Sequence, residues 1–205
     1  MPSPAPLIPS TPPAEPWEKL AANHWGPTEE GLYILLVIDE LTRYPEAVVV
    51  KSTRADANIE AFDNMFSRHG YPKKLKTDGG PPFNGNENHE LQKYFKWAGI
   101  KHSPTHSAED PEANGLAEAF MKKIQKIWHT AHVERKNPKA ELNKMLQQYR
   151  ATPHPTTGQA PAELLFGRKF RTRLPQSSGT SERKDILAAR ERENKIKQKQ
   201  KAAKD

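Results

Sequence analysis

Two acidic residues and one asparagine are the positions at which this chain could carry cation-dependent chemistry. Asp78 lies in Lys-Thr-Asp-Gly-Gly-Pro-Pro-Phe, Glu118 ends Glu-Ala-Asn-Gly-Leu-Ala-Glu, and Asn23 lies far upstream of both. Carboxylate oxygens are the hard ligands that Mg²⁺ prefers. Taken singly, an aspartate after a strand is more often a turn or cap residue, and a glutamate on a helix usually faces solvent. The three residues form a site only if the fold brings them together.

Three strands are expected in the first part of the chain, at residues 17–25, 32–38 and 44–50. Residues 32–38 are continuously apolar and rich in branched side chains, which is typical of a strand buried on both faces. A Gly26-Pro27 turn region separates the first two strands. Because the connections between the three strands are short, we expect an antiparallel meander.

The hydrophobic period then changes from that of strands to an alternation of helices and strands. We expect a helix that Gly70 and Pro72 end, and a long helix from near Asn114 with a buried face at three- and four-residue steps. Alternation of this kind implies parallel pairing through right-handed crossovers. The prediction is an α/β fold in the order β-β-β-α-β-α-β-α, with a mixed five-stranded sheet flanked by helices. Its later elements are a strand at 73–77, a helix around 87–98, a strand at 100–103, and helices at 138–149 and 161–166; the long helix should bury Leu116, Phe120, Ile124, Ile127 and Ala131.

This topology would place the three candidate residues side by side. If the first and fourth strands are neighbours, Asn23 in one lies beside Asp78 at the end of the other. Glu118, one turn into the long helix, would then approach them from above the sheet.

Several short motifs in the order of one known family carry a resemblance that covers roughly Trp17 to Pro175. The motifs are Trp17-Glu-Lys-Leu, Gly26-Pro27, Val37-Ile-Asp-Glu-Leu-Thr-Arg-Tyr-Pro-Glu46, Arg68-His-Gly-Tyr-Pro72, Thr77-Asp78, Pro81-Pro-Phe83, Asn114-Gly115 with Glu118, Tyr149-Arg-Ala-Thr-Pro153 and Pro161-Ala-Glu-Leu-Leu-Phe-Gly167. In these residues the chain resembles the catalytic core of retroviral and Ty3/Gypsy-type retrotransposon integrases, the D,D-E recombinases.

The resemblance implies an RNase H-like fold and a DNA strand-transfer reaction that uses two Mg²⁺ or Mn²⁺ ions. One ion activates the attacking oxygen and the other stabilises the leaving oxygen. By resemblance, Asn23, Asp78 and Glu118 occupy the catalytic positions, and Asp78 and Glu118 are the metal ligands. The family also implies DNA as partner, a homodimer or higher oligomer, and nuclear residence.

Asn23 departs from the family, because relatives carry a metal-bridging carboxylate at this position. A neutral amide cannot offset the repulsion of two dications about 4 Å apart. With a hairpin turning near residue 28, Asn23 should pair near residue 33, which would leave Asp39 about 20 Å away. Gly79 in place of the usual asparagine and the longer interval from Asp78 to Glu118 are further departures. We therefore expect weak or lost metal binding and impaired activity; the alternatives are a catalytically inert DNA-binding or assembly module and a nuclease of the same fold.

Basic residues near the expected site and after the last helix are candidates for contacts with DNA phosphates. Lys122 and Gln125 share the helix face of Glu118, although Lys122 could instead form an i, i+4 ion pair with that residue. The second group consists of Arg168, Lys169, Arg171 and Arg173, for which a solvated surface strip is the simpler interpretation.

Composition limits the remaining classes of function. The net charge is +7, but residues 181–205 hold nine basic and five acidic residues, so the preceding 180 carry only +3. There is no cysteine, so we expect no zinc site; His129-x-x-His132 is the one close histidine pair. No apolar run is long enough to cross a membrane, and we expect a soluble intracellular protein.

Three regions are expected along the chain. Residues 1–16 contain seven prolines and are typical of a linker. Residues 17–175 form the integrase-core-like domain. Residues 176–205 form a basic tail, helical or disordered, with too few large apolar groups to fold by itself.

Overall fold

The computed structural model describes residues 13–83, 89–104 and 111–172, with the backbone alone at 111–114. Contacts divide the chain into two compact units. The first comprises residues up to Glu40 together with Glu46–Gln125, and the second comprises Leu41–Pro45 together with residues from Lys126 onward. The linker expected at 1–16 is described only from residue 13, and the tail expected at 176–205 lies outside the described residues.

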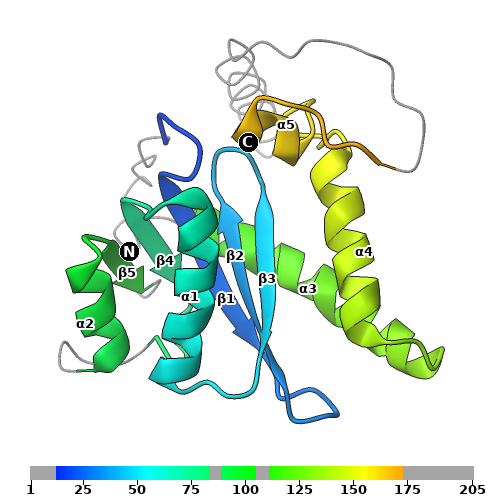
Figure 1. Cartoon of the computed structure of the whole chain (residues 1–205), viewed down its shortest axis with the longest axis horizontal. Coiled ribbons are helices and arrows are strands. Elements are labelled where there is room, and N and C mark those ends of the chain that lie inside the picture. Colours follow the sequence, from blue (N-terminus) through cyan, green and yellow to red (C-terminus); the bar gives the residue numbers. More distant parts are fainter. Residues whose placement is uncertain (1–12, 84–88, 105–110, 173–205) are drawn as a thin grey trace, which may run out of the picture. The chain divides into compact units, whose positions relative to one another are not determined.

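One five-stranded sheet has the order β3-β2-β1-β4-β5 (Figure 1). β1 pairs with β2 antiparallel and with β4 parallel, and β4 pairs with β5 parallel. The mixed sheet and the expected β-β-β-α-β-α-β-α order are therefore confirmed. The strands are β1 (Lys19–Trp25), β2 (Tyr33–Asp39), β3 (Pro45–Val50), β4 (Lys74–Thr77) and β5 (Lys101–Pro104).

The described residues form five helices, and residues that favour helix ends mark the bounds of two of them. Gly70, with a φ of 86°, caps the first helix as expected, and Asn137 caps the fourth by accepting bonds from two backbone amides, next to Pro138 in its first turn. The helices are α1 (Ala55–His69), α2 (Glu90–Trp97), α3 (Pro111–Val133), α4 (Pro138–Ala151) and α5 (Pro161–Phe166).

The long helix differs from expectation in two details. It begins at Pro111, three residues before Asn114, since proline is well tolerated in the first turn of a helix. Its buried stripe is also rotated by about one residue: Leu116 and Ile127 are only half-buried. Phe120, Ile124 and Ala131 are buried as expected, and Ala117, Met121 and Trp128 are buried in place of Leu116 and Ile127.

The two faces of the sheet in the first unit can be assigned from side-chain contacts. On one face, His24 of β1 bonds Asn58 of α1, and His102 of β5 bonds Gln92 of α2. Residues of β1 with the opposite parity, Ala21 and Asn23, point to the other face, along which Figure 1 draws the first part of α3 behind the sheet. Strand β2, which lies between β3 and β1, is buried throughout from Ile34 to Asp39.

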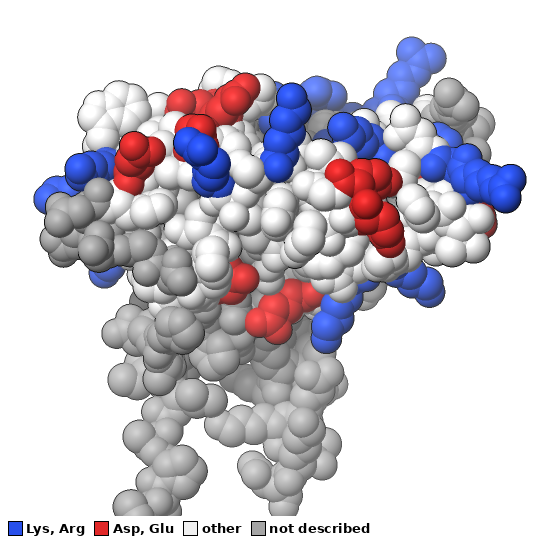
Figure 2. All heavy atoms as spheres, turned by 90° about the horizontal axis from the view of Figure 1, so that it is seen from below, with Lys and Arg blue, Asp and Glu red and all other residues white. Residues whose placement is uncertain are grey.

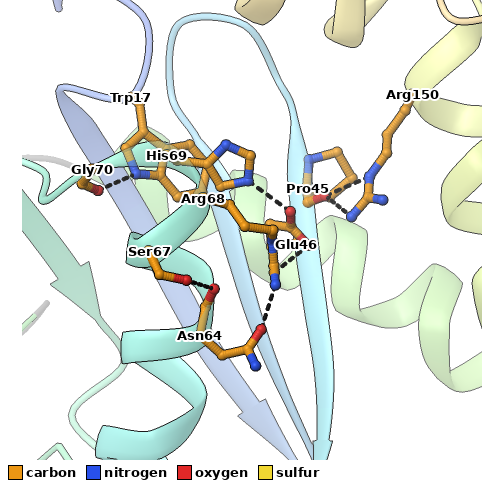
Figure 3. A network of polar contacts seen from close by, with 9 residues as sticks. All are labelled: Trp17, Pro45, Glu46, Asn64, Ser67, Arg68, His69, Gly70 and Arg150. Carbon is orange, nitrogen blue, oxygen red and sulfur yellow. Dashed lines mark hydrogen bonds and ion pairs between the residues drawn. The ribbon is translucent and has the colours of Figure 1, made fainter.

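Three of the segments that carry the family resemblance meet in one polar cluster of the first unit (Figure 3). The indole N–H of Trp17 donates to the Gly70 carbonyl at 3.0 Å, and its ring lies 4.4 Å from that of His69. His69 also bonds the Glu46 carboxylate at 2.8 Å, and Arg68 pairs with the same carboxylate. This cluster ties the entry to β1, the end of α1 and the start of β3 together, so these motifs have a structural role.

The second unit has its own polar tie. Arg150 of α4 donates through Nε and Nη2 to the Pro45 carbonyl at 3.0 and 2.8 Å (Figure 3), and its guanidinium lies 4.8 Å from the centre of the Tyr44 ring. Leu142 and Leu146 of α4 and Leu164 of α5 are buried in this unit. The Tyr149–Pro153 motif thus contributes an arginine that fixes the segment between β2 and β3.

Candidate functional site

Asn23 and Asp78 lie next to each other at the carboxyl ends of two parallel neighbours. The register of β1 and β4 runs from Lys19 opposite Lys74 to Ala22 opposite Thr77, so its next pair is Asn23 and Asp78. Asn23 is 8% exposed, and Asp78 is half-buried. The expected juxtaposition of these two positions is present.

Glu118 approaches from α3, which lies over the same face. Burial and, to a smaller extent, the negative charge of Glu118 raise the pKa of Asp78 to about 6. Glu118 itself is exposed. The two carboxylates are therefore within electrostatic reach of each other, which is the arrangement that a divalent cation would relieve.

Asp78 has an oxygen without a partner. Its Oδ1 atom is buried and has no hydrogen bond among the described residues. A buried carboxylate oxygen in this condition loses its hydration without compensation. A Cβ built on Gly80 would lie 3.6 Å from the Asp78 Oδ2 atom, in ordinary contact, so Gly80 is a direct neighbour of the second oxygen.

These residues fit one divalent cation but not two. Asp78 and Glu118 supply two carboxylates, and Asn23 could add a neutral oxygen. Within the described ranges there is no group of three or more His, Cys, Asp or Glu residues that could hold a metal ion. A pair of ions would need a third anionic ligand, and position 23 does not provide it.

Asp39 does not replace the missing carboxylate, although the register expected for it was wrong. Asn23 pairs with Leu36 rather than near residue 33, and Asp39 pairs with Leu20. Asp39 is thus three residues along the strand from the position opposite Asn23, about 10 Å instead of 20 Å. An offset of three residues turns its side chain to the opposite face of the sheet, where it is fully buried.

A hydrogen-bonded chain behind Asp78 was not expected from the sequence. Thr77 Oγ1 lies 2.9 Å from His102 Nε2, His102 Nδ1 lies 2.9 Å from Gln92 Oε1, and Gln92 Nε2 donates to the Phe83 carbonyl at 3.2 Å. Burial lowers the pKa of His102 to about 4, so the ring is neutral at pH 7. Because the glutamine oxygen can only accept, Nδ1 carries the proton and the Thr77 hydroxyl donates to Nε2. One imidazole therefore holds both ends of the segment that contains Asp78.

Acidification is expected to weaken the hydrogen bonds of His102 with Thr77 and Gln92. The folded-state pKa of His102 lies below its ordinary value of 6.5, so its contribution to stability is present above pH 6.5 and is lost as pH falls toward 4. The loss is at most about 3 kcal/mol. We expect the free energy of unfolding of His102→Gln, measured by urea denaturation across this pH range, to change less with pH than that of the unaltered chain. His129→Gln, a change at an exposed histidine, should keep the original dependence; parallel curves for His102→Gln would contradict the assignment.

Of the expected DNA-contact residues, two lie in the first unit. Lys122 and Gln125 are on α3 after Glu118, with Lys122 exposed and Gln125 half-buried. Lys122 forms no ion pair within the described residues, so the alternative of an i, i+4 pair with Glu118 is not observed. Figure 2, which views the molecule from below, shows Lys and Arg side chains interspersed with Asp and Glu side chains on that side.

The other group follows α5 in the second unit. Arg168, Lys169 and Arg171 are exposed, and the Arg168 guanidinium lies 5.3 Å from the centre of the Phe170 ring. Arg173 lies outside the described residues. A search of the described helices finds none with the length and apolar character of a membrane span.

Sequence comparisons agree with the resemblance. Residues 21–109 match the family model of the integrase core domain. The chain is also 34% identical over 175 residues to the uncharacterized protein K02A2.6 of Caenorhabditis elegans. That match covers 85% of this chain but 13% of the relative, so the chain spans a small part of the relative's length.

Solved structures share the fold at low identity. The integrase catalytic core of HTLV-2, solved with magnesium in a trimeric form, has a TM-score of 0.59 at 18% identity, covering 74% of this chain and 98% of that one. An intasome chain of simian T-cell lymphotropic virus scores 0.65 at 15% identity, with coverages of 84% and 62%. The BIV integrase core scores 0.59 at 16% identity, with coverages of 73% and 93%. The five-stranded sheet and its flanking helices thus have the RNase H-like arrangement of integrase catalytic cores.

Proposed function

Because this chain carries an integrase core domain of the retroelement type, we propose that it derives from a DNA strand transferase and that Asn23 has impaired its chemistry. The observation that carries the proposal is the state of Asp78. Its carboxylate is half-buried next to Glu118, with one buried oxygen lacking any partner in the described structure. An oxygen in this condition is available to a cation that replaces its lost hydration.

In this proposal Asp78 and Glu118 are the ligands for Mg²⁺ or Mn²⁺. A bound pair of such ions would activate the attacking oxygen and stabilise the leaving oxygen of the phosphoryl group. Asp78 and Glu118 would each be an anionic ligand of one ion. In the family the residue at position 23 is a carboxylate shared by both ions, and here it is Asn23. The chain's own residues still provide a pair of carboxylates, one of them half-buried, and the hydrogen bonds of His102 hold the segment that contains Asp78.

Asn23 removes the charge that would let two dications approach each other. Two such ions repel strongly at the separation of about 4 Å that the reaction needs, and a bridging carboxylate offsets part of this repulsion. An amide oxygen contributes a dipole instead of a full charge. We therefore propose that one ion binds weakly at Asp78 and Glu118 and that strand transfer is lost or slow.

DNA binding does not depend on the missing carboxylate. We propose that Lys122 and Gln125 contact phosphates near Asp78 and Glu118, and that Arg168, Lys169, Arg171 and Arg173 add sequence-independent contacts. The HTLV-2 core was solved as a trimeric form and the simian viral chain is part of an intasome. By analogy with these relatives, we propose that this chain assembles as an oligomer on DNA and acts in the nucleus.

An oligonucleotide assay on the unaltered chain tests this function. Labelled DNA ends and a target duplex, incubated with Mg²⁺ or Mn²⁺, should be bound without forming joined products. Joined products from the unaltered chain would contradict the impairment. Cleavage without joining would instead identify a nuclease of the same fold, and absence of DNA binding would remove the integrase-derived role.

A further inference from the structure

The segments that enter three parallel strands lie together at one end of the sheet. β4 is the parallel neighbour of both β1 and β5, so the residues before these strands lie side by side. The Lys73 amide donates to the Glu18 carbonyl at 3.0 Å, and the Lys101 amide donates to the Lys73 carbonyl at 2.9 Å. The segments at this end are residues 13–18, residues 70–73 and residues 97–100.

Two exposed aromatic rings contact each other at this end of the sheet. Tyr71, on the connection that enters β4, is 51% exposed, and Trp97, at the end of α2, is 74% exposed. Their rings meet edge-on with centroids 6.2 Å apart. A buried ring lies against each of them, because Phe66 is 5.7 Å from Tyr71 and Tyr94 is 6.1 Å from Trp97. Tyr71 and Trp97, named here the ring pair, are therefore exposed apolar groups that packing holds in place.

Trp17 fixes where the start of the chain meets this end of the sheet. Its indole N–H donates at 3.0 Å to the carbonyl of Gly70, the residue before Tyr71. Trp17 is 5% exposed, and its φ of 65° lies in a region that a bulky residue adopts only where its surroundings hold it. The entry to β1 thus has a defined position beside the ring pair.

Glu18 holds the preceding residues against the same connection. Its carboxylate accepts a bond from the Ala14 amide at 2.8 Å and another from the Lys73 ammonium group at 3.2 Å. Ala14 and Lys73 therefore meet at one carboxylate. The part of the chain that precedes Ala14 is thus attached next to the connection that carries Tyr71.

Residues 1–12 have the length and the composition to cover the ring pair. β1 and β5 are two strand spacings apart, about 10 Å, whereas twelve residues in polyproline II geometry span about 37 Å. These residues include no charged side chain, and Pro6, Pro9 and Pro12 recur at every third position. Because polyproline II has three residues per turn, this spacing would place the three prolines on one face, named here the proline face. Exposed aromatic rings are the groups that bind such proline-rich segments.

We propose that residues 1–12 bind the ring pair of the same chain through their proline face. The segment of a second copy would offer the same prolines, but attachment at Trp17 gives the chain's own segment an effective concentration on the order of millimolar. This interaction uses neither a metal ion nor a carboxylate at position 23. It can therefore fail or succeed independently of the proposed strand-transferase origin.

Paramagnetic broadening in the full-length protein tests the proposal. The chain has no cysteine, so Ser3→Cys provides a single attachment site for a nitroxide. The nitroxide should strongly broaden the indole N–H resonance of Trp97, because this effect falls steeply with distance. Trp25 lies at the far end of β1, about 20 Å along the strand, and its indole resonance should be much less affected.

Matched proline substitutions in the Ser3→Cys background test the role of the proline face. Pro6→Ala/Pro9→Ala should restore most of the lost Trp97 intensity. Pro2→Ala/Pro4→Ala removes two prolines of the same segment that lie outside the proline face, and it should leave the broadening unchanged. Equal recovery in the two double variants would overturn the proposal.

The mobility of the nitroxide, measured by electron paramagnetic resonance, supplies a readout that does not depend on Trp97 as reporter. Trp97→Ala removes half of the ring pair and should mobilise the nitroxide. Val133→Ala shortens another exposed apolar side chain, 83% exposed and outside the ring pair, and should leave the mobility unchanged. Circular dichroism verifies that both variants are folded. Unchanged mobility in Trp97→Ala would contradict docking on the ring pair.

A mixed sample identifies the molecule that supplies the segment. Isotope-labelled protein without nitroxide, mixed with unlabelled protein that carries it, should show an unbroadened Trp97 resonance. Broadening in this mixture as strong as that within one chain would make a second copy the occupant. A Trp97 resonance that no nitroxide affects, but that shifts on addition of a single-stranded oligonucleotide, would assign the ring pair to nucleic acid. Either result would overturn the proposal.

Discussion

Asn23→Asp is expected to give the chain metal-dependent strand-joining activity at least about a hundredfold above that of the unaltered protein. The substitution returns an anion to a position that is 8% exposed and lies beside Asp78. Bound divalent ions contribute several kcal/mol of charge stabilisation in reactions of this type, and about 1.4 kcal/mol corresponds to a factor of ten. The assay is joining of labelled DNA ends with Mg²⁺ or Mn²⁺.

The same variant should need metal for its stability. Without a divalent cation, a third carboxylate close to Asp78 and Glu118 adds repulsion, so the melting temperature should fall below that of the unaltered chain. With Mn²⁺ in excess of its dissociation constant it should recover, because a ligand that binds only the folded state stabilises it. Asn143→Asp makes the same change at an exposed position of α4 and should show neither effect. Inactivity of folded, Mn²⁺-stabilised Asn23→Asp would show that residue 23 is not the lesion.

Asp78→Asn is expected to stabilise the metal-free protein at neutral pH. The pKa of Asp78 is raised from 3.8 to about 6, so the carboxyl favours the folded state below pH 3.8, and this contribution disappears as pH rises through 6. At pH 7.5 the ionised group therefore destabilises the fold, by about 1–2 kcal/mol after allowance for its partial exposure. Urea denaturation at pH 7.5 should show a gain of this size in the variant.

The gain should vanish on acidification and should depend on Glu118. Near pH 4 Asp78 is largely protonated in the folded state, so the two proteins should differ little. Glu118→Gln removes the negative charge next to Asp78 and should lower the pKa of Asp78, measured by carboxyl-resolved NMR titration. If Asp78→Asn is less stable than the unaltered chain at pH 7.5, Asp78 is a structural residue and the functional interpretation fails.

The arrangement of the sheet could be predicted because each element carries its own signal. The apolar run of β2 required burial on both faces, and Gly70 marked the end of α1. The parallel pairing of β1 with β4 then placed Asn23 beside Asp78 without any knowledge of side-chain contacts. The positions of residues that follow from strand topology could therefore be predicted from the sequence.

The register of the first hairpin could not be predicted from the sequence, because it depends on the geometry of the turn. Gly26-Pro27 suggested a turn centred near residue 28. The chain instead turns through a loop in which Thr28 receives a bond from Gly31 and donates to Leu32. Gly26 has a φ of 145°, and a Cβ there would lie 2.6 Å from Tyr33, so it serves the entry to the loop rather than its centre. The expected centre of the turn was one and a half residues too early. Because moving the centre of a hairpin by one residue moves the paired partner by two, the predicted partner of Asn23 was three residues away from the observed one.

The His102 chain was missed for a different reason. A histidine in a predicted strand gives no sign of its partners, which come from Thr77 on β4 and Gln92 on α2. The imidazole of His102 is neutral because it is buried in the folded protein, and no local pattern in the sequence indicates this burial. Polar chains that cross three elements become visible only with coordinates.

Counting bound manganese by anomalous diffraction tests the central claim most directly. Crystals of the unaltered chain soaked in Mn²⁺ should show one weakly occupied ion between Asp78 and Glu118, and crystals of Asn23→Asp should show two ions sharing the new carboxylate. Two ions beside Asp78 in the unaltered chain, or none in either protein, would contradict the account.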